Sequence, residues 1–220
     1  MEAAAFFHKE VFGRIDEGKQ NRIITAAAEE FADKGFAAAN INVIAENAGV
    51  SVGSLYKYFE SKNHLYLDVV NRGLALIDEA LAPVLSSDLS LAGKIAGIVD
   101  AIFEGTRTHP LMNRLYCRFT AEGDGDLARS LAIRLETITA EAYSSLLAQA
   151  QEEGLMDSSC DERAAAFFMD NLFLALQFSL SSEYWKDRMD IYLGKERASD
   201  PDLLKRQMVA FLCRALGIDG

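Results

Sequence analysis

The chain has 220 residues, half of them hydrophobic and a quarter charged, which is the composition of an ordinary folded globular protein. No apolar run approaches the roughly 18–20 residues that span a bilayer, and a net charge of −11, taken alone, argues against nucleic acid as a partner. The first 65 residues are nearly balanced, with seven Lys and Arg against nine Asp and Glu, so nucleic acid stays open as a partner of this part.

Helices are predicted throughout, because the chain has only three prolines and fifteen glycines and no alternation of apolar and polar residues persists. The first is a short piece within "AAAFFHKEVFGRI", whose Phe6, Phe7, Phe12 and Ile15 we expect to pack onto the next elements. Early acids, and no basic stretch before an apolar one, indicate that this segment is not a secretory signal.

A longer helix is predicted over residues 19–34. Ile24, Ala28 and Phe31 share one apolar face at helical spacing. Gly35 stands where a residue with left-handed backbone would end the helix.

Two short helices are predicted next, over residues 41–48 and 52–59. Asn40 and Ser51 precede them and have side chains that cap helix N-termini, and Gly49 between them tolerates the positive φ of a tight turn. Two short helices joined by a turn that contains glycine are the signature of a helix-turn-helix.

The second short helix separates into an inner and an outer side. Leu55 and Phe59 are expected to face inward, with Ile44 and Ala45 of the first helix. The residues expected to face outward, or to lie at the helix N-terminus, are Ser51, Val52, Gly53, Ser54, Tyr56, Lys57 and Tyr58. Burial of both tyrosines as plain core aromatics is the alternative, which we disfavour because four large side chains do not fit on one helix face.

This outer set suits contact with DNA. Gly53 lets the backbone approach a surface closely, and the hydroxyls of Ser54 and of the two tyrosines can donate to phosphate oxygens. Lys57 and Lys62 supply positive charge, and the helix that begins after Ser61 presents free N–H groups. Ordinary solvated lysines and simple helix caps are plainer interpretations of the same residues.

The remaining elements are longer helices. Ser61 caps one over residues 62–81, and Pro83 with "SSDLS" marks the loop after it. Further helices are predicted over residues 89–107, 110–121, 126–153, 161–186 and 201–216. We expect an all-α protein with an N-terminal three-helix domain over residues 1–62 and a larger C-terminal helical domain over residues 63–220.

Residues 22–70 resemble the TetR family of transcriptional regulators. The resemblance is carried by "RIITAAAEEFADKGF" and by "IAENAGVSVGSLYKYFESKNHLY", in which IA, AGVS, G-S-L-Y, Y-F and S-K keep the family's order. Asn40 stands where the family usually has Thr or Ser, and His64 where a Glu usually follows the capping Ser. Val43 and Val52 are apolar where many members are polar. The rest of the chain resembles the family only in being helical.

The resemblance implies a homodimer that binds an operator in double-stranded DNA through the N-terminal domain and a small effector through the C-terminal domain. By position, the implied DNA contacts are Asn40, Ser51, Val52, Gly53, Ser54, Tyr56, Lys57, Tyr58 and Lys62. The implied function is transcriptional regulation by a repressor that the effector releases from DNA. An activator, or a helical adaptor that does not bind DNA, is the alternative with the same fold.

The C-terminal two-thirds predicts a dimer and a pocket. The segments 160–185 and 201–216 are rich in apolar residues, so two copies of each would form a four-helix interface, and a large monomeric core is the alternative. The candidate effector contacts are Arg107, His109, Arg114, Tyr116, Phe119, Phe168, Asn171 and Tyr184. An arginine turned toward an apolar interior needs an anion, so we expect an effector with an apolar body and a polar or anionic head.

Catalytic and metal chemistry have no signature in the sequence. The three histidines are scattered, and no phosphate loop, nucleophile elbow or Ser/His/Asp constellation occurs. The acids of "DERAAAFFMD" are interpreted as helix-end and surface charges. We therefore expect no metal, no cofactor and no enzymatic activity, with a small helical enzyme as the alternative. Cys117, Cys160 and Cys213 lie in apolar contexts, which predicts free thiols and a cytoplasmic protein.

Overall fold

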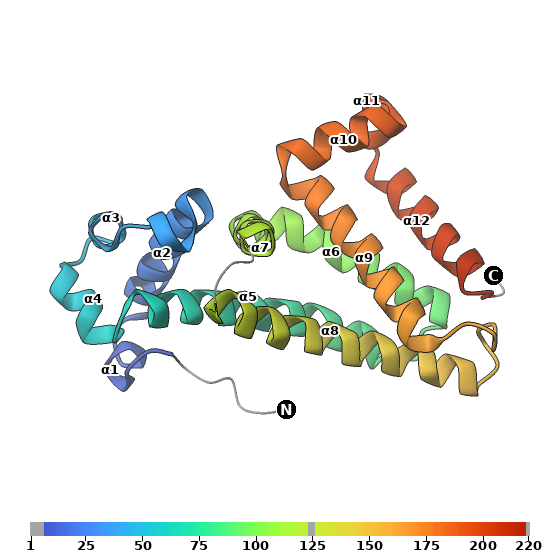
Figure 1. Ribbon diagram of the computed structural model, residues 1–220, viewed down its shortest axis with the longest axis horizontal. Coiled ribbons are helices and arrows are strands. Elements are labelled where there is room, and N and C mark those ends of the chain that lie inside the picture. Colours follow the sequence, from blue (N-terminus) through green and yellow to red (C-terminus); the bar gives the residue numbers. More distant parts are fainter. Residues whose placement is uncertain (1–6, 123–125, 219–220) are drawn as a thin grey trace. The chain divides into compact units, whose positions relative to one another are not determined.

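A computed structural model of the chain describes residues 7–122 and 126–218. These residues form helices and no strand, which confirms the predicted all-α class (Figure 1). The helices are α1 (Glu10–Gly13), α2 (Glu17–Ala38), α3 (Ile41–Asn47), α4 (Val52–Tyr58), α5 (Lys62–Leu85), α6 (Leu91–Thr108), α7 (Pro110–Glu122), α8 (Asp126–Glu152), α9 (Glu162–Ser181), α10 (Glu183–Leu193), α11 (Lys195–Ala198) and α12 (Pro201–Ala215).

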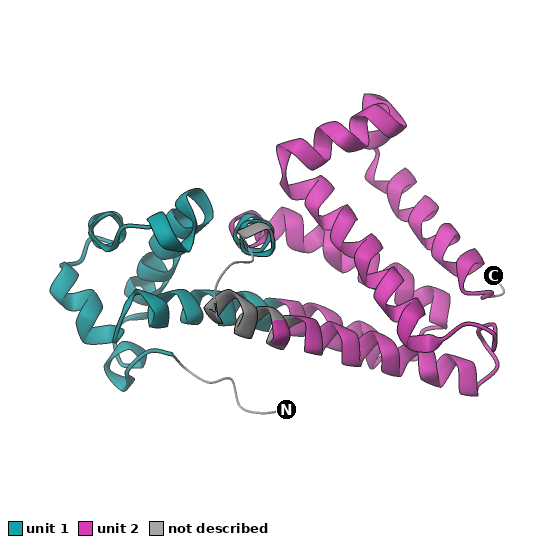
Figure 2. Cartoon of the chain, in the orientation of Figure 1, with its two compact units in different colours: residues 1–76, 114–132 teal, residues 77–113, 133–220 magenta. Residues whose placement is uncertain are grey.

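The chain divides into two compact units (Figure 2). Unit 1 contains residues 1–76 and 114–132, and unit 2 contains residues 77–113 and 133–220. The division falls inside α5, after Leu76. The first turns of α5 remain with unit 1 because Leu65, Tyr66 and Val69 are buried, and the Tyr66 ring lies 4.8 Å from that of Phe31 on α2.

Helix α2 supplies the base of the helix-turn-helix. Its N-cap is Asp16, whose Oδ1 accepts the Lys19 N–H at 3.0 Å. The predicted apolar face is buried, including Ile24 and Phe31. Gly35 takes a φ of 72°, as the sequence predicts, and bends α2 three residues before its end instead of ending it.

Helix α5 runs past its predicted end. Pro83 was expected to mark a loop, but it lies in the last turn and the helix ends at Leu85. A proline this close to the C-terminus removes one hydrogen bond, and side chains from outside the helix satisfy carbonyls of the last turn. Lys94 Nζ donates to the Leu85 carbonyl at 2.8 Å, and Ser86 Oγ donates to the Ala82 carbonyl at 2.8 Å.

The core of unit 2 is a layer of apolar side chains from α6, α8, α9 and α12. Its most deeply buried members are Ile95, Ile98, Val99, Leu147, Met169, Phe173 and Leu212. Gly97 on α6 brings α5 close, because a Cβ at this position would lie 2.7 Å from Val84 Cγ1. The three cysteines are half-buried free thiols, and burial raises the pKa of Cys117 to about 11.

The segment predicted as one helix over residues 161–186 is two helices. Ser182 is extended, with φ −127° and ψ 133°, and separates α9 from α10. By length and composition alone, α9 is the one helix among the described residues that could cross a membrane. It nevertheless buries Met169 and Phe173 in the core of unit 2, as the core helix of a folded domain does.

Candidate nucleic-acid interface

The helix-turn-helix forms from local capping. Asn40 Oδ1 accepts the Asn42 N–H at 2.9 Å and begins α3, and Ser51 Oγ accepts the Ser54 N–H at 3.1 Å and begins α4. Gly49 adopts a φ of 65° in the turn, where any other residue would be strained. Both predicted caps and the predicted glycine turn are therefore confirmed.

The inner sides of α3 and α4 pack together as predicted. Ile44, Ala45, Leu55 and Phe59 are all buried. Ala48, in the turn, is also fully buried. This packing fixes which side of α4 remains at the surface.

The surface side of α4 carries hydroxyls, a glycine and a lysine. Ser51, Gly53, Tyr56 and Lys57 are exposed, whereas Val52 and Ser54 are half-buried. The Tyr56 side chain stays 47% exposed although it is aromatic. The hydroxyls of Ser51 and Ser54 lie 2.9 Å apart, so the two serines form one polar group at the start of the helix.

No neighbouring atom of the described chain excludes a side chain at position 53, where the sequence has glycine. A Cβ built at Gly53 would meet only Ser51 Oγ, at 3.8 Å, which is an ordinary van der Waals distance. Its backbone is helical, and glycine inside a helix costs about 1 kcal/mol relative to alanine. The residue therefore lowers the stability of a helix that has room for a side chain.

Tyr58 does not lie on this surface, contrary to the prediction. It is 6% exposed, its hydroxyl accepts a hydrogen bond from Lys19 Nζ at 3.1 Å, and its ring packs 5.6 Å from that of Phe12. We expected Phe59 to share the helix face and so to leave no room there for Tyr58. Phe59 instead follows the helix in extended conformation, with φ −125°, which leaves room for Tyr58 inside.

The Lys62 side chain is bound to backbone carbonyls within unit 1. Its Nζ donates to the carbonyls of Ala37 and Ala39, at 3.2 and 3.0 Å, and lies 4.8 Å from the centre of the Phe36 ring. This ammonium satisfies carbonyls at the C-terminal end of α2, as cations commonly do at helix C-termini. Asn40 remains exposed, so its cap does not remove it from the surface.

Ser61 and His64 form a pair that replaces the usual capping box. The His64 N–H donates to Ser61 Oγ at 3.4 Å, and His64 Nδ1 lies 2.9 Å from the same oxygen. The histidine thus stays bonded to the capping serine, although it lies where the resembled family usually has Glu. The start of α5, which follows α4, is fixed by this pair.

A short N-terminal segment holds the end of α4, a role that the sequence did not reveal. The Lys9 N–H donates to the Tyr58 carbonyl at 2.8 Å, and Lys9 Nζ donates to the Tyr56 carbonyl at 3.2 Å. Phe12, which is fully buried, places its ring 4.8 Å from Phe59. The aromatic residues of this segment predicted packing, but only the structure identifies α4 as the element that they hold.

The expected effector contacts differ widely in burial. Phe119 is buried and Tyr116 half-buried. The exposed members are Arg107, His109, Arg114, Phe168, Asn171 and Tyr184. Most of the set therefore lies at the surface of its own unit, because helical spacing does not reveal which side of a helix a neighbouring helix covers.

Two of these residues, Arg107 and Arg114, form ion pairs at the protein surface. Arg107 binds Glu104 on its own helix, at 2.5 Å, and this pairing lowers the pKa of the Glu104 carboxyl. Arg114 pairs with Asp33 of α2 within unit 1. Both arginines are exposed, so the argument that an interior arginine calls for an anionic ligand does not apply to them.

Unit 2 contains polar groups that the sequence did not single out. Asn113 is buried, donates to the carbonyls of Gly105 and His109, and accepts a hydrogen bond from Gln177 of α9. Burial raises the pKa of Asp170 to about 6, and the nearby Glu136 carboxylate adds to the shift. Asp170 belongs to the run of acids interpreted as surface charges, an interpretation that its partial burial corrects.

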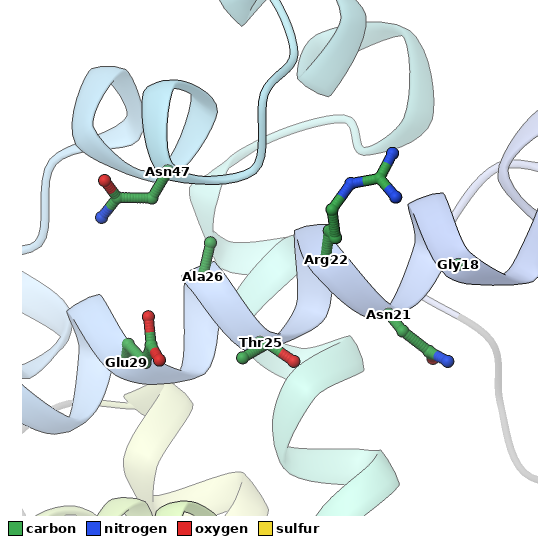
Figure 3. Close-up of a pocket in the computed structure, with 7 residues that line it drawn as sticks. All are labelled: Gly18, Asn21, Arg22, Thr25, Ala26, Glu29 and Asn47. Carbon is green, nitrogen blue, oxygen red and sulfur yellow. The ribbon is translucent and has the colours of Figure 1, made fainter.

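A shallow groove of about 280 Å³ lies between α2 and α3 in unit 1 (Figure 3). Its lining consists of Gly18, Asn21, Arg22, Thr25, Ala26, Glu29 and Asn47. Asn47 is the lining residue that α3 contributes, and five of the seven lining residues have polar side chains. Among the residues that the structure describes, no group of three or more His, Cys, Asp or Glu side chains is placed to hold a metal ion.

The helix-turn-helix matches a known family. Residues 23–69 fit the family model described as bacterial regulatory proteins, tetR family. The chain is 33% identical over 86 residues to the HTH-type transcriptional activator FasR of Mycolicibacterium smegmatis, covering 39% of each chain. It is 33% identical over 106 residues to the HTH-type transcriptional regulator RutR of Escherichia coli, covering 47% of this chain and 49% of RutR. The matches thus span less than half the length of these relatives.

Likeness in fold extends further than likeness in sequence. The structure of the transcriptional regulator FadR from Bacillus subtilis in complex with stearoyl-CoA aligns with a TM-score of 0.71. This alignment covers 87% of the chain and 96% of FadR at 17% identity, so it supports the two-unit helical fold alone.

Proposed function

Because the chain belongs to the TetR family of bacterial regulatory proteins, we propose that it is a transcriptional regulator that binds operator DNA through the exposed side of α4. Gly53 is the observation that carries the proposal. The described chain has room for a side chain at this position, yet the helix keeps the residue that costs it stability. Close approach of a duplex to the backbone accounts for the glycine.

The proposed contacts follow from exposure and donor chemistry. The hydroxyls of Ser51, Ser54 and Tyr56 donate to phosphate or to base edges, and Lys57 supplies charge. We include Asn40, Val52 and Gly53 in the proposed DNA-contacting surface because of their positions in the helix-turn-helix. Lys62 and Tyr58 are proposed to position α4 and α5 instead of touching DNA, since both are bound within unit 1.

We propose that two copies form a dimer through α9 and α12. Phe167 and Phe168 on α9 and Phe211 on α12 are exposed phenyl groups within one unit, which a second chain would cover. A dimer also gives the specificity that one short recognition helix lacks, because two such helices read two half-sites about 34–36 Å apart.

We propose that a small effector with an apolar body and a polar head releases the protein from DNA, so that it acts as a repressor. The stearoyl-CoA in the FadR structure is a molecule of this kind, bound to a protein of the same fold. FasR is named as an activator, which keeps activation as the second candidate. In either case we propose a cytoplasmic protein without enzymatic activity.

Replacing Tyr56 or Lys57 by Ala is expected to weaken DNA binding about fivefold each, since an exposed hydrogen bond or ion pair contributes about 1 kcal/mol. The melting temperature should not fall, because both side chains are exposed. Fluorescence anisotropy with the duplex upstream of the protein's own gene, at low salt, measures the affinity.

The salt dependence of DNA affinity distinguishes the variant at Lys57 from the variant at Tyr56. Loss of one phosphate contact at Lys57 should reduce the slope of log affinity against log salt by about 1. Lys186→Ala, which removes an exposed lysine of α10, is the control and should leave affinity unchanged. Equal losses of affinity and of melting temperature at Tyr56 and Lys57 would contradict the assignment of these residues as contacts.

A further inference from the structure

Helix α10 carries an exposed stripe with an unusual order of side chains. Tyr184, Asp187, Arg188 and Ile191 follow the spacing i, i+3, i+4, i+7 and therefore share one face of the helix. All four are exposed, with Tyr184 at 72% and Ile191 at 82%. In chain order the stripe, which we call the α10 stripe, is aromatic, acidic, basic and aliphatic.

The described part of the chain uses other faces of α10. Trp185 packs against Phe178 of α9, with the two rings 5.8 Å apart. Lys186 and Asp190, whose charged atoms lie 4.0 Å apart, occupy the side turned away from the stripe. Two members of the stripe contact neighbours on α10 itself, because the Tyr184 ring lies 6.3 Å from that of Trp185 and Arg188 packs against Trp185 and Tyr192. All four side chains nevertheless stay exposed, so the α10 stripe is open to a partner outside the chain.

The α10 stripe is complementary to itself when its direction is reversed. In a two-fold interface residue i contacts residue j, and residue j contacts residue i. If two α10 helices lie antiparallel, Tyr184 faces the partner's Ile191, and Asp187 faces the partner's Arg188. Because of the two-fold symmetry each of these contacts occurs twice, which gives two apolar and two charged contacts in the pair. No Asp187 faces the partner's Asp187, and no Arg188 faces the partner's Arg188.

We propose that α10 pairs antiparallel with α10 of a second copy of this chain. The Arg188 guanidinium lies 5.9 Å from the centre of the Trp185 ring and 4.9 Å from that of Tyr192, so these two rings fix the charge beside the stripe. Charge order along a helix stripe is a known means of selecting partner and direction.

This pairing goes beyond the proposed function and does not depend on DNA binding. It also differs from the interface proposed for α9 and α12. Phe167 and Phe168 lie near the start of α9, whereas α10 follows the end of α9, at the opposite end of that helix in unit 2 (Figure 1). A protein that failed to bind DNA could therefore still show the pairing.

Charge reversal within the α10 stripe tests the proposal. Asp187→Arg gives a chain with two adjacent arginines, and Arg188→Asp gives a chain with two adjacent aspartates. Each variant repels its own copy at both charged contacts, so we expect its α10-dependent self-association to weaken about tenfold or more. The two variants attract each other, because every arginine then faces a partner's aspartate.

The two variants, co-expressed with different tags and without DNA, are therefore expected to form mixed complexes well above the statistical share, as counted by native mass spectrometry. The double variant Asp187→Arg with Arg188→Asp restores opposite charges and should associate like the parent chain. Lys186→Asp makes the same charge change as Arg188→Asp outside the α10 stripe and should leave association unchanged. Statistical mixing, together with parent-like association of both single variants, would overturn the proposal.

Discussion

Phe12→Ala is expected to lower the free energy of unfolding of unit 1 by about 3–5 kcal/mol, which is the usual cost of truncating a fully buried phenylalanine. Phe12 is 0% exposed, and its ring lies 4.8 Å from Phe59 and 5.6 Å from Tyr58. Domains are stable by about 5–15 kcal/mol, so the loss removes a large part of the total. DNA binding should disappear at temperatures at which unit 2 remains folded.

Amide hydrogen exchange read by mass spectrometry locates this effect. Peptides that contain α4 should lose protection in Phe12→Ala, whereas peptides from α6 and α9 should keep it. Phe167→Ala truncates the same kind of side chain in unit 2 and should leave α4 protected. Unchanged protection of α4 in Phe12→Ala would show that the N-terminal segment does not hold the recognition helix.

Gly53→Ala is expected to change stability and DNA affinity in opposite directions. Alanine fits the helical backbone, and its Cβ would meet nothing closer than Ser51 Oγ at 3.8 Å. The free energy of unfolding of unit 1 should therefore increase by about 0.4–1 kcal/mol, and its melting temperature should rise. The added methyl group would stand between the backbone and a duplex. We therefore expect DNA affinity to fall at least about tenfold, or about 1.4 kcal/mol.

Gly105→Ala is the matched control for this prediction. Gly105 lies inside α6, and a Cβ there would have no heavy atom of the described chain within 4 Å. The substitution should stabilise unit 2 to a similar degree and leave DNA affinity unchanged. Calorimetry and anisotropy on the same samples measure both quantities, and undiminished affinity of Gly53→Ala would remove the main support for the proposed contact.

The helix-turn-helix could be predicted from sequence because its determinants are local. A cap at Asn40, a cap at Ser51 and a glycine at position 49 act within a few residues, and each takes the predicted conformation. The division of Tyr56 and Tyr58 between surface and core could not be predicted. It depends on Phe12 of α1, whose ring packs against Tyr58, and on the departure of Phe59 from the helix.

Prediction also failed at Pro83, a residue that usually ends a helix, and at α10, where the sequence shows no clear helix face. Pro83 lies in the last turn of α5, where serine and lysine side chains bind the carbonyls of Ala82 and Leu85. Helix α10 has exposed apolar residues and buries none, so it lacks the apolar face by which helices are recognised in sequence. Burial of the effector candidates depends on contacts between distant helices, which the spacing within one helix does not contain.

Site-specific photo-crosslinking tests the central claim most directly, namely that the exposed side of α4 contacts DNA. A benzophenone amino acid in place of Tyr56 is expected to form a covalent bond to the bound duplex on irradiation. The same amino acid in place of Tyr184, an exposed tyrosine of α10, is expected to form none. If the protein binds the duplex but position 56 gives no crosslink, DNA lies against another surface and α4 is not the helix that reads the operator.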